Sequence, residues 1–334
     1  MTGGASVAGL IDRYGRTIDY LRVSVTDRCD LRCRYCMSEQ MRFLPRTQLM
    51  GRDDIATIVG RFIARGVRKV RITGGEPLVR RDILDLIEDL GTHLGQGLEE
   101  LTLTTNGTQL ERCAARLHSA GVKRINVSLD TRDPLLFRQI TRRGDLDKVL
   151  AGLHAAKGCG LAVKINMVVL AGLNDTEVPA MLRWCGVQGF DLSLIETMPL
   201  GAIDEDRADR FVPLTEILER LSGEFALERD AHRTSGPARY WRSPWGTRLG
   251  LISPLTANFC DGCNRVRLTT DGKLYTCLGH DDAVDLRHAL RAGGAPALDA
   301  AIDHGLAHKP ARHHFRIEPG SGPTVARHMS VTGG

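Results

Sequence analysis

The sequence lacks any long uncharged apolar stretch, and its first twenty residues contain no apolar segment like that of a signal peptide. These absences argue against a membrane-spanning helix and a secretory signal, so we expect a cytoplasmic protein without a membrane partner. Aromatic residues make up only 5% of the chain, and no Lys/Arg-rich run with interleaved aromatics occurs. We therefore expect no nucleic-acid partner. The net charge of +5 is compatible with a small polyanionic substrate.

Short apolar runs alternate with amphipathic stretches over the N-terminal part of the chain. The runs have the length and period of β-strands and span Leu21–Val25, Lys69–Thr73, Leu101–Thr105, Arg124–Leu129, Ala162–Leu170 and Asp191–Glu196. Helices are predicted between them at Arg52–Arg65, Asp82–His93, Gln109–Ala120, Asp145–Lys157 and Thr176–Cys185. Strands that alternate with helices form right-handed βαβ units, so the sequence predicts an α/β fold with a parallel sheet.

Five of these strands keep one polar face, which is unusual for a parallel sheet. Alternation places polar side chains or glycine on one side at Arg22/Ser24/Thr26, Arg71/Thr73/Gly75, Thr102/Thr104/Asn106, Asn126/Ser128/Asp130 and Lys164/Asn166. A parallel sheet covered by helices on both sides should be apolar throughout, and a complete eight-stranded barrel should be filled with branched apolar residues. A solvated open sheet is one alternative. We favour an incomplete (β/α)6 barrel of the TIM type, curved around a polar cavity.

The pattern changes after Pro213, and we predict a smaller C-terminal domain that closes the open side of the barrel. The predicted boundaries are 1–213 for the barrel, 214–320 for the C-terminal domain and 321–334 for a flexible tail. The expected elements of the C-terminal part are a helix at Leu214–Leu221, a linker at Arg233–Arg248, strands at Arg265–Thr269 and Lys273–Cys277, and helices at Asp281–Arg291 and Ala297–Asp303. Asp271-Gly272 between the two strands predicts a type I′ hairpin turn.

Six of the nine cysteines fall into two triplets, Cys29/Cys33/Cys36 and Cys260/Cys263/Cys277. The first triplet directly follows the first predicted strand, at the end where barrels carry reactive groups. Three thiolates in one loop suit a four-iron cluster in which one iron has no protein ligand. A structural zinc site, which would need a fourth ligand, and free thiols are the alternatives. The remaining cysteines, Cys113, Cys159 and Cys185, lie in helical stretches and are predicted to be structural.

The first triplet resembles the signature of the radical S-adenosylmethionine superfamily, Cys-x3-Cys-x-aromatic-Cys, with Tyr35 as the aromatic residue. Gly74-Gly75-Glu76-Pro77 resembles the GGE motif of that superfamily, and glycine permits a ligand to approach the backbone closely. The resemblance implies a [4Fe–4S] cluster whose open iron chelates the amino and carboxylate groups of S-adenosylmethionine. One-electron reduction would then release a 5′-deoxyadenosyl radical.

The second triplet by itself is weaker evidence for an iron–sulfur cluster than the first, because a zinc ribbon that lacks one ligand has similar cysteine spacing. The residues after Cys263 favour an anion site. Alternation places Arg265 and Arg267 on the same face of the predicted hairpin, where two guanidinium groups form a bidentate anion clamp. A solvated arginine face is the alternative.

The combined motifs resemble the GTP 3′,8-cyclase family of molybdenum cofactor biosynthesis over nearly the whole chain. The resemblance rests on both cysteine spacings, the Arg265-x-Arg267 pair and the terminal Gly333-Gly334. It implies a second [4Fe–4S] cluster at Cys260, Cys263 and Cys277 that holds the guanine of GTP. The implied GTP contacts are Arg22, Arg71, Thr104, Lys164, Arg265, Val266 and Arg267. The implied S-adenosylmethionine contacts are Tyr35, Gly74, Gly75, Glu76, Ser128 and Met198, and the residues expected to support catalysis are Arg265, Arg267, Gly333 and Gly334.

The same resemblance implies the reaction and its partners. The radical would abstract hydrogen from the 3′ carbon of the ribose, and ring closure at C8 of guanine would give (8S)-3′,8-cyclo-7,8-dihydro-GTP. A flavodoxin- or ferredoxin-like protein would supply electrons, and cyclic pyranopterin monophosphate synthase would receive the product. A homodimer is compatible with this assignment. The terminal glycines would enter the active site, and a frayed terminus is the alternative.

One position departs from the family, and two other functions stay open. Family members often carry an arginine in the sixth strand where this chain has Ser193, so no role of that arginine is transferred. A radical S-adenosylmethionine peptide maturase with an auxiliary cluster would be expected to have further C-terminal cysteines and a peptide-recognition extension, which the sequence does not show. A non-catalytic metal-binding regulator would contain zinc and present a basic surface.

Overall fold

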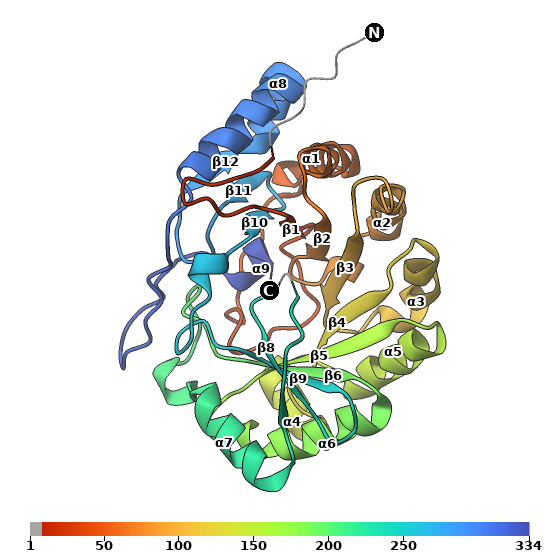
Figure 1. Cartoon of the computed structure of the whole chain (residues 1–334), viewed down its shortest axis with the longest axis vertical. Helices are drawn as coiled ribbons and strands as arrows, with labels where there is room; N and C mark the ends of the chain where they lie inside the picture. The colour runs from red at the N-terminus through yellow and green to blue at the C-terminus, as the bar shows by residue number, and fades with distance from the viewer. Residues whose placement is uncertain (1–8, 235, 334) are drawn as a thin grey trace.

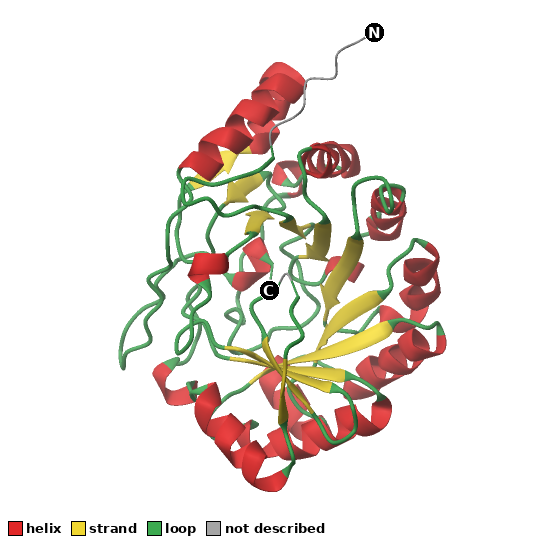
Figure 2. Cartoon of the chain, viewed as in Figure 1, coloured by secondary structure: helices red, strands yellow, loops and turns green. Residues whose placement is uncertain are grey.

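The computed structural model describes residues 9–234 and 236–333, whose strands form one sheet in the order β12-β11-β10-β1-β2-β3-β4-β5-β6-β9-β8-β7 (Figures 1 and 2). The strands are β1 (Tyr20–Ser24), β2 (Lys69–Thr73), β3 (Glu100–Thr105), β4 (Arg124–Ser128), β5 (Ala162–Val168), β6 (Asp191–Ile195), β7 (Glu228–Asp230), β8 (Arg239–Arg242), β9 (Arg248–Ile252), β10 (Arg265–Leu268), β11 (Lys273–Tyr275) and β12 (Ala283–Asp285). The α-helices are α1 (Arg52–Ala64), α2 (Ile83–Gly91), α3 (Leu110–Ser119), α4 (Pro134–Thr141), α5 (Leu146–Gly158), α6 (Val178–Gln188), α7 (Leu214–Glu224), α8 (Leu286–Ala307) and α9 (Met329–Thr332).

Strands β1 to β6 pair in chain order, and each is parallel to the next. Every strand predicted in this part is present, with ends that differ by at most two residues. The predicted α/β fold with a parallel sheet is therefore confirmed. Helix α4 is additional to the prediction. It begins at Pro134, and the Asp133 side chain caps it by accepting a hydrogen bond from the Leu136 backbone N–H.

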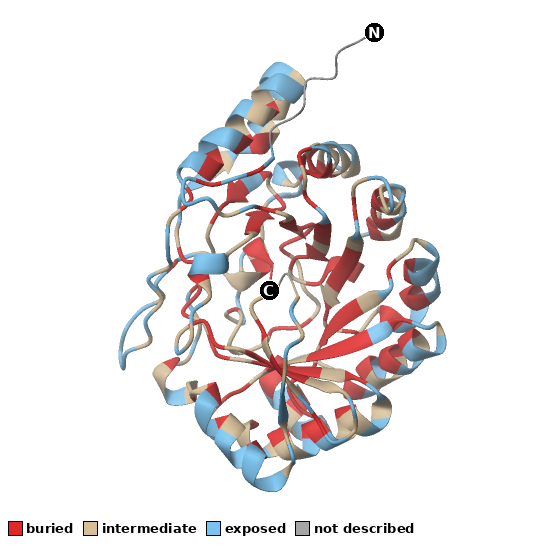
Figure 3. Ribbon diagram, viewed as in Figure 1, coloured by how far each residue is buried: buried red, intermediate tan, exposed pale blue. Residues whose placement is uncertain are grey.

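The two faces of the parallel strands differ in polarity, as their alternation predicts. Val23, Val70, Leu103, Ile125 and Ile165 are fully buried and belong to the hydrophobic core. Figure 3 shows helices α1, α2, α3 and α5 around the outside of the strands, with exposed residues on the sides that face away from the sheet. Burial of the apolar face stabilises the sheet, and the opposite, polar face is left to line an internal space.

The C-terminal part of the chain adds strands to both edges of the same sheet. β10 pairs in parallel with β1, and β9 pairs in parallel with β6. β8 and β7 continue from β9, and β11 and β12 continue from β10, all antiparallel. The linker predicted at Arg233–Arg248 is wrong in its second half, because that segment contains β8 and the start of β9. β8 has only four residues, Arg-Tyr-Trp-Arg, and is too short to show the alternation by which strands are predicted.

The predicted type I′ turn at Asp271-Gly272 is also wrong. A type I′ turn requires positive φ at both central residues, but Gly272 has φ 89° and Asp271 is not among the positive-φ residues. The loop is longer because Thr269 stabilises it: its hydroxyl donates to Asp271 at 2.5 Å and accepts from the Lys273 N–H at 3.0 Å.

Helix α8 packs against α1 at the edge of the sheet. Arg61 of α1 and Arg65, which directly follows this helix, form ion pairs with Asp299, and Arg65 also pairs with Asp303. The backbone of α8 is not helical at Gly293 and Gly294, so the two helices predicted here are confirmed as segments on either side of this kink. The predicted start at Asp281 is wrong, because Ala283–Asp285 forms β12 and the helix begins at Leu286. Among the helices of the described ranges, none is both long and apolar enough to cross a membrane.

The core should depend strongly on Phe62, a fully buried residue of α1. Phe62→Ala removes a ring from a packed interior, and we expect the free energy of unfolding to fall by about 3–5 kcal/mol. Leu135→Ala is the control because Leu135 is 81% exposed, and its effect should stay within about 0.5 kcal/mol. Denaturant unfolding of both variants measures this difference; equal losses would contradict the assigned core.

Candidate active site

Two cavities adjoin on the polar face of the sheet. The N-terminal cavity has a volume of about 160 Å³, and its walls include Cys29, Cys33 and Cys36. The C-terminal cavity has a similar volume of about 160 Å³, and its walls include Cys260, Cys263 and Cys277. Asn166, Ile195 and Met198 line both. The fold therefore brings two cysteine triplets from opposite ends of the chain to neighbouring spaces.

Glycines after β2 fix the loop that carries the first triplet. Gly75 N–H donates to the Thr26 carbonyl, and Glu76 N–H donates to the Arg28 carbonyl, both at 2.8 Å. A Cβ atom at Gly75 would lie 2.3 Å from the Arg28 carbonyl oxygen. Because backbone cannot yield to so close a contact, only glycine fits here. The GGE motif thus packs its backbone directly against the loop that leads to Cys29.

Two buried carboxyl groups organise the N-terminal cavity. Glu76 lies behind the wall and accepts hydrogen bonds from Leu78 N–H (2.9 Å), the Thr105 hydroxyl (2.8 Å) and Asn106 N–H (2.6 Å). Burial raises its pKa to about 7, although these hydrogen bonds act in the opposite direction. The Tyr35 hydroxyl donates to Asp130 at 2.7 Å. Asp130 also accepts from Val168 N–H, so it fixes the Tyr35 ring relative to β5.

The first triplet provides donors that fit an iron–sulfur cluster. Burial raises the pKa of all three thiols, that of Cys36 to about 11, so a bound cation is needed to make them thiolates. Within the described residues, no three Cys, His, Asp or Glu side chains lie close enough to hold a single metal ion. The three sulfurs instead share one cavity wall, an arrangement that suits ligands of different irons in one cluster.

Cationic side chains dominate the C-terminal cavity, which is lined by Arg22, Lys69, Arg71, Arg124, Lys164, Arg265 and Arg267. The register explains this accumulation, because β10, β1 and β2 place Arg267, Arg22 and Arg71 on directly neighbouring positions. Glu100 forms ion pairs with Lys69 and Arg124. No Asp or Glu of the described chain lines the cavity itself. Such an excess of buried positive charge favours a bound anion.

The cations that line this cavity change the pKa values of neighbouring side chains. Burial alone would raise the pKa of Tyr20, but the surrounding cations, led by Arg71, outweigh it and lower this pKa to about 8. Burial, together with the neighbouring Arg265 charge, lowers the pKa of Arg267 to about 10. The ring of Tyr20 also lies within cation–π distance of Arg71 and Arg265, at 5.8 Å from each guanidinium carbon.

Lys164 is held by an aromatic residue that the sequence analysis does not identify. Its ammonium donates to the Tyr240 hydroxyl at 2.9 Å and lies 4.7 Å from the ring centroid. A Cβ atom at Gly250 would lie 3.0 Å from both the Ser193 hydroxyl and the Tyr240 ring. Small residues at positions 193 and 250 therefore leave room for Tyr240, at the place where the resembling family often has an arginine.

The second triplet assembles at one end of the β10–β11 hairpin. Cys260 and Cys263 precede β10, and Cys277 follows β11. Burial would raise the pKa of Cys263, but the positive charges of Lys309 and Arg265 outweigh it and leave this pKa below its ordinary value. Burial raises the pKa of Cys277. The two triplets thus differ in the charge that surrounds them.

The C-terminal segment lies inside the curve of the sheet, where Figure 1 shows α9. Met329 and Ser330 line the N-terminal cavity. The Gly333 carbonyl accepts a hydrogen bond from Arg267 at 2.8 Å, and a Cβ atom there would lie 2.1 Å from a Thr73 side-chain carbon. Within the segment predicted to be a flexible tail, Ser330, Thr332 and Gly333 are buried, whereas several residues between 321 and 326 are exposed. Gly334 lies outside the described residues.

Most predicted site residues line the two cavities. Those of the N-terminal cavity are Tyr35, Gly74, Gly75, Thr104, Ser128 and Met198, and those of the C-terminal cavity are Arg22, Arg71, Lys164, Met198, Arg265 and Arg267. Thr104 also contacts a residue of the C-terminal cavity, because its hydroxyl accepts a hydrogen bond from Arg71 at 3.4 Å. Val266 and Glu76 line neither cavity. The side chain of Val266 is fully buried in the hydrophobic core, and Glu76 is fully buried behind the cavity wall.

Several wall residues were missed by the sequence analysis. Tyr20 and Lys69 share the alternating face of Arg22 and Arg71, so the period of the strands contains the signal for both. Tyr20 was not identified as a wall residue because the strand begins one residue earlier than predicted. Tyr240 carries no such signal, because its strand lies in the segment interpreted as a linker.

Two family models match the chain. The model described as "Radical SAM superfamily" covers residues 23–185, which contain the first triplet. The model described as "Molybdenum Cofactor Synthesis C" covers residues 190–315, which contain the second.

Curated relatives match over nearly the full length. A protein named GTP 3′,8-cyclase from Rhodopseudomonas palustris is 57% identical over 97% of this chain and 96% of its own. Proteins of the same name from Erythrobacter litoralis and Nitrobacter hamburgensis are each 54% identical, over 97% and 100% of this chain and 98% of their own lengths.

Solved structures share the fold at low identity. Streptococcus suis SuiB bound to S-adenosylmethionine is 16% identical with a TM-score of 0.58; the match covers 81% of this chain and 64% of that one. SuiB bound to the precursor peptide SuiA has a TM-score of 0.56 at 15% identity, over 86% of this chain and 68% of that one. At this identity the likeness shows the fold alone.

The cation-rich cavity should be visible in the titration of Tyr20. We expect one tyrosine of the folded protein to ionise near pH 8, and inorganic triphosphate to raise that pKa by neutralising the cations. The folded pKa lies below the unfolded value of 10, so the stability that ionisation contributes is present above pH 10 and is lost as the pH falls through 8.

Ultraviolet titration of the tyrosinate band measures this, with Tyr20→Phe as the control that removes the transition. A transition near pH 8 that persists in Tyr20→Phe, or that ignores triphosphate, would contradict the described electrostatics.

Proposed function

The chain belongs to the GTP 3′,8-cyclase family of radical S-adenosylmethionine enzymes, and we propose that it converts GTP to (8S)-3′,8-cyclo-7,8-dihydro-GTP in the first step of molybdenum cofactor biosynthesis. The observation that supports this most is the adjacency of the two cavities. One contains the radical-superfamily triplet, the other is walled by cations, and Asn166 and Met198 line both.

The proposal includes a finer description of the fold. Residues 1–213 would form an incomplete (β/α)6 barrel, and residues 214–320 would form the smaller domain that closes it and carries the second cluster. In support, β1 and β6 of the described chain do not pair with each other but with β10 and β9. An open side between β1 and β6 is therefore bordered by C-terminal strands.

Each triplet would hold one [4Fe–4S] cluster with an open coordination position. The first cluster, when bound, supplies the electron that cleaves S-adenosylmethionine. Tyr35, Gly75 and Ser128 would contact S-adenosylmethionine, since they line the N-terminal cavity beside the cysteines. At the second triplet the guanine base would occupy the open position, in line with the site implied by the sequence.

The protein side chains would mainly bind and orient the two substrates. Arg22, Arg71 and Lys164 would hold the triphosphate together with Arg265 and Arg267, because charge-assisted hydrogen bonds to phosphate are the strongest these groups can form. A bound triphosphate also offsets the repulsion among these cations. The ribose would then lie near Met198 and Asn166, where the cavities meet, so that its 3′ carbon faces S-adenosylmethionine.

The C-terminal tail would complete the site. Gly333 accepts from Arg267, and the terminal Gly333-Gly334 would place backbone beside the substrates without side-chain bulk. We also propose a flavodoxin- or ferredoxin-like reductant, transfer of product to cyclic pyranopterin monophosphate synthase, a cytoplasmic location and a homodimer.

An anaerobic assay tests the function. The protein is reconstituted with iron and sulfide and incubated with dithionite, S-adenosylmethionine and GTP. We expect about eight irons per chain and the formation of both 5′-deoxyadenosine and an isomer of GTP. Cys29→Ala should abolish both products, whereas Cys113→Ala in α3 should retain them. Zinc in place of iron, or cleavage of S-adenosylmethionine that ignores GTP, would overturn the proposal.

The arginine clamp gives a sharper prediction. Replacing Arg265 and Arg267 by Ala removes two charged hydrogen-bond donors of about 1.5–3 kcal/mol each, so we expect GTP binding to weaken roughly 100-fold or more. The first cluster should keep its iron content and spectrum. Equilibrium binding and iron analysis measure the two effects, and an unchanged GTP affinity would reject the clamp.

Deletion of Gly333-Gly334 tests the tail. We expect turnover to fall at least about tenfold, because Arg267 loses its carbonyl acceptor and the site loses backbone contact. The melting temperature should fall far less than turnover, since the deletion removes only the last two residues, with the hydrogen bond from Arg267 to Gly333. Undiminished product formation would show that the tail has no part in catalysis.

A further inference from the structure

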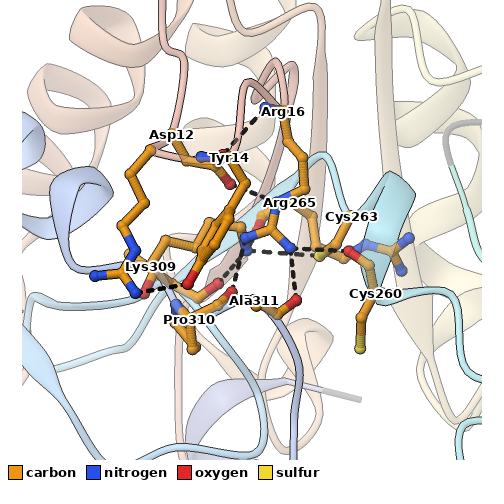
Figure 4. A network of polar contacts seen from close by, with 11 residues as sticks. Asp12, Tyr14, Arg16, Cys260, Cys263, Arg265, Lys309, Pro310 and Ala311 are labelled. Atoms are coloured by element: carbon orange, nitrogen blue, oxygen red, sulfur yellow. Dashed lines mark hydrogen bonds and ion pairs between the residues drawn. The ribbon is translucent and has the colours of Figure 1, made fainter.

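Lys309 is a fully buried lysine that none of the assignments above uses. Only 1% of its surface is exposed, and it is among the largest fully buried side chains of the described chain. It follows α8 directly and lies beside the second triplet, as Figure 4 shows. Lysines are almost never buried without a partner, so this position needs an explanation.

Three acceptors surround the Lys309 ammonium. It donates to the Thr276 carbonyl at 2.5 Å, to the Arg265 carbonyl at 3.2 Å and to the Cys263 sulfur at 3.5 Å. Carbonyl oxygens only accept hydrogen bonds, so the amine donates to both, and its three N–H groups match the three acceptors. The ammonium therefore joins the segment of Cys263 to the residue that precedes Cys277.

No carboxylate balances this charge. Among the described residues Lys309 forms no ion pair, and the sulfur of Cys263 is the only one of its three partners that can carry a full negative charge. A buried ammonium is costly unless a negative group accompanies it. Thiolates bound to an iron–sulfur cluster would supply that charge.

The N-terminal segment holds Lys309 in place. Arg16 donates to the carbonyl groups of Pro310 (2.7 Å), Ala311 (2.8 Å) and Cys260 (2.9 Å). Its Nε atom pairs with Asp12 at 2.6 Å, and both side chains are almost inaccessible to solvent. One guanidinium therefore ties the chain after Lys309 to the loop of the second triplet (Figure 4).

Among the described residues, no cationic side chain donates a hydrogen bond to a sulfur of the first triplet, and Arg207 acts on Cys36 through its charge alone. The hydrogen bonds to the Cys29 sulfur come from Leu31 N–H at 3.4 Å and from the Asn106 amide at 3.8 Å, both neutral. A charged donor to a cluster sulfur raises the reduction potential of the cluster, because it stabilises the more negative, reduced state. The two sites thus differ in the group that would control electron affinity.

We propose that Lys309 is a positioning residue of the second cluster, which aligns the segments of Cys263 and Cys277 and raises the reduction potential through its hydrogen bond to Cys263. This inference rests on the proposed function, in which the second triplet binds an iron–sulfur cluster. Lys309 does not contact substrate; it acts through the cysteine ligand.

The experiment isolates the second cluster and reads its potential. In a chain with Cys29, Cys33 and Cys36 replaced by Ala, an electron paramagnetic resonance redox titration follows the remaining cluster. Lys309→Gln keeps a neutral donor and should lower the one-electron reduction equilibrium constant at least about tenfold, a shift of about 59 mV to more negative potential. Lys309→Arg should largely restore it. Lys273→Gln, at a half-exposed lysine of β11, is the control and should not change it.

The outcomes separate this inference from the function on which it rests. Wild-type iron content and potential in Lys309→Gln would overturn the role of Lys309 alone. Absence of iron at the second triplet of the otherwise native chain would overturn both. If Lys309→Gln loses only the second-site iron in the chain with all cysteines, while the first cluster is retained, the positioning role is supported. Retention of both clusters with a lowered second potential supports the full proposal.

Discussion

The parallel pairing of β10 with β1 is the constraint on which the rest of the site depends. It joins strands more than 240 residues apart and aligns Tyr20 with Arg265 and Arg22 with Arg267. The pairing continues the polar face of the parallel strands beyond β1. It also draws the loop of Cys260 and Cys263 to the cavity, because that loop precedes β10. Without this pairing the second triplet and its arginines would have no fixed relation to the first.

The same pairing creates an electrostatic cost that the substrate would relieve. Neighbouring strands bring Arg267, Arg22 and Arg71 together in a space that no described acidic side chain lines. The lowered pKa of Tyr20 results from that excess charge, and the lowered pKa of Arg267 results from burial first and from the neighbouring Arg265 charge second. The apolar core on the opposite face of the strands stabilises the fold enough to offset the repulsion among these cations. A polyanion that fills the cavity would remove this repulsion, which would make its binding free energy more favourable.

Local pattern predicted much of this, and long-range pairing explains the rest. The six parallel strands and the polar wall residues follow from alternation, since each position depends only on its own strand. β8 and Tyr240 could not be predicted, because a strand of four residues, Arg-Tyr-Trp-Arg, is too short to show a distinctive period. The contact of Lys309 with Cys263 depends on how the chain after α8 folds back, which no spacing in the sequence records. The prediction of a type I′ turn is wrong because Thr269 stabilises a longer loop.

In the proposed arrangement the two triplets serve adjoining cavities, and the ribose of GTP would lie beside S-adenosylmethionine. The most direct measurement uses GTP with deuterium at the 3′ carbon of the ribose in the anaerobic reaction, followed by mass analysis of 5′-deoxyadenosine. We expect deuterium to move into the 5′-deoxyadenosine, because the reacting carbon would face the N-terminal cavity in the proposed arrangement. Formation of unlabelled 5′-deoxyadenosine together with cyclised product that keeps the deuterium would contradict it.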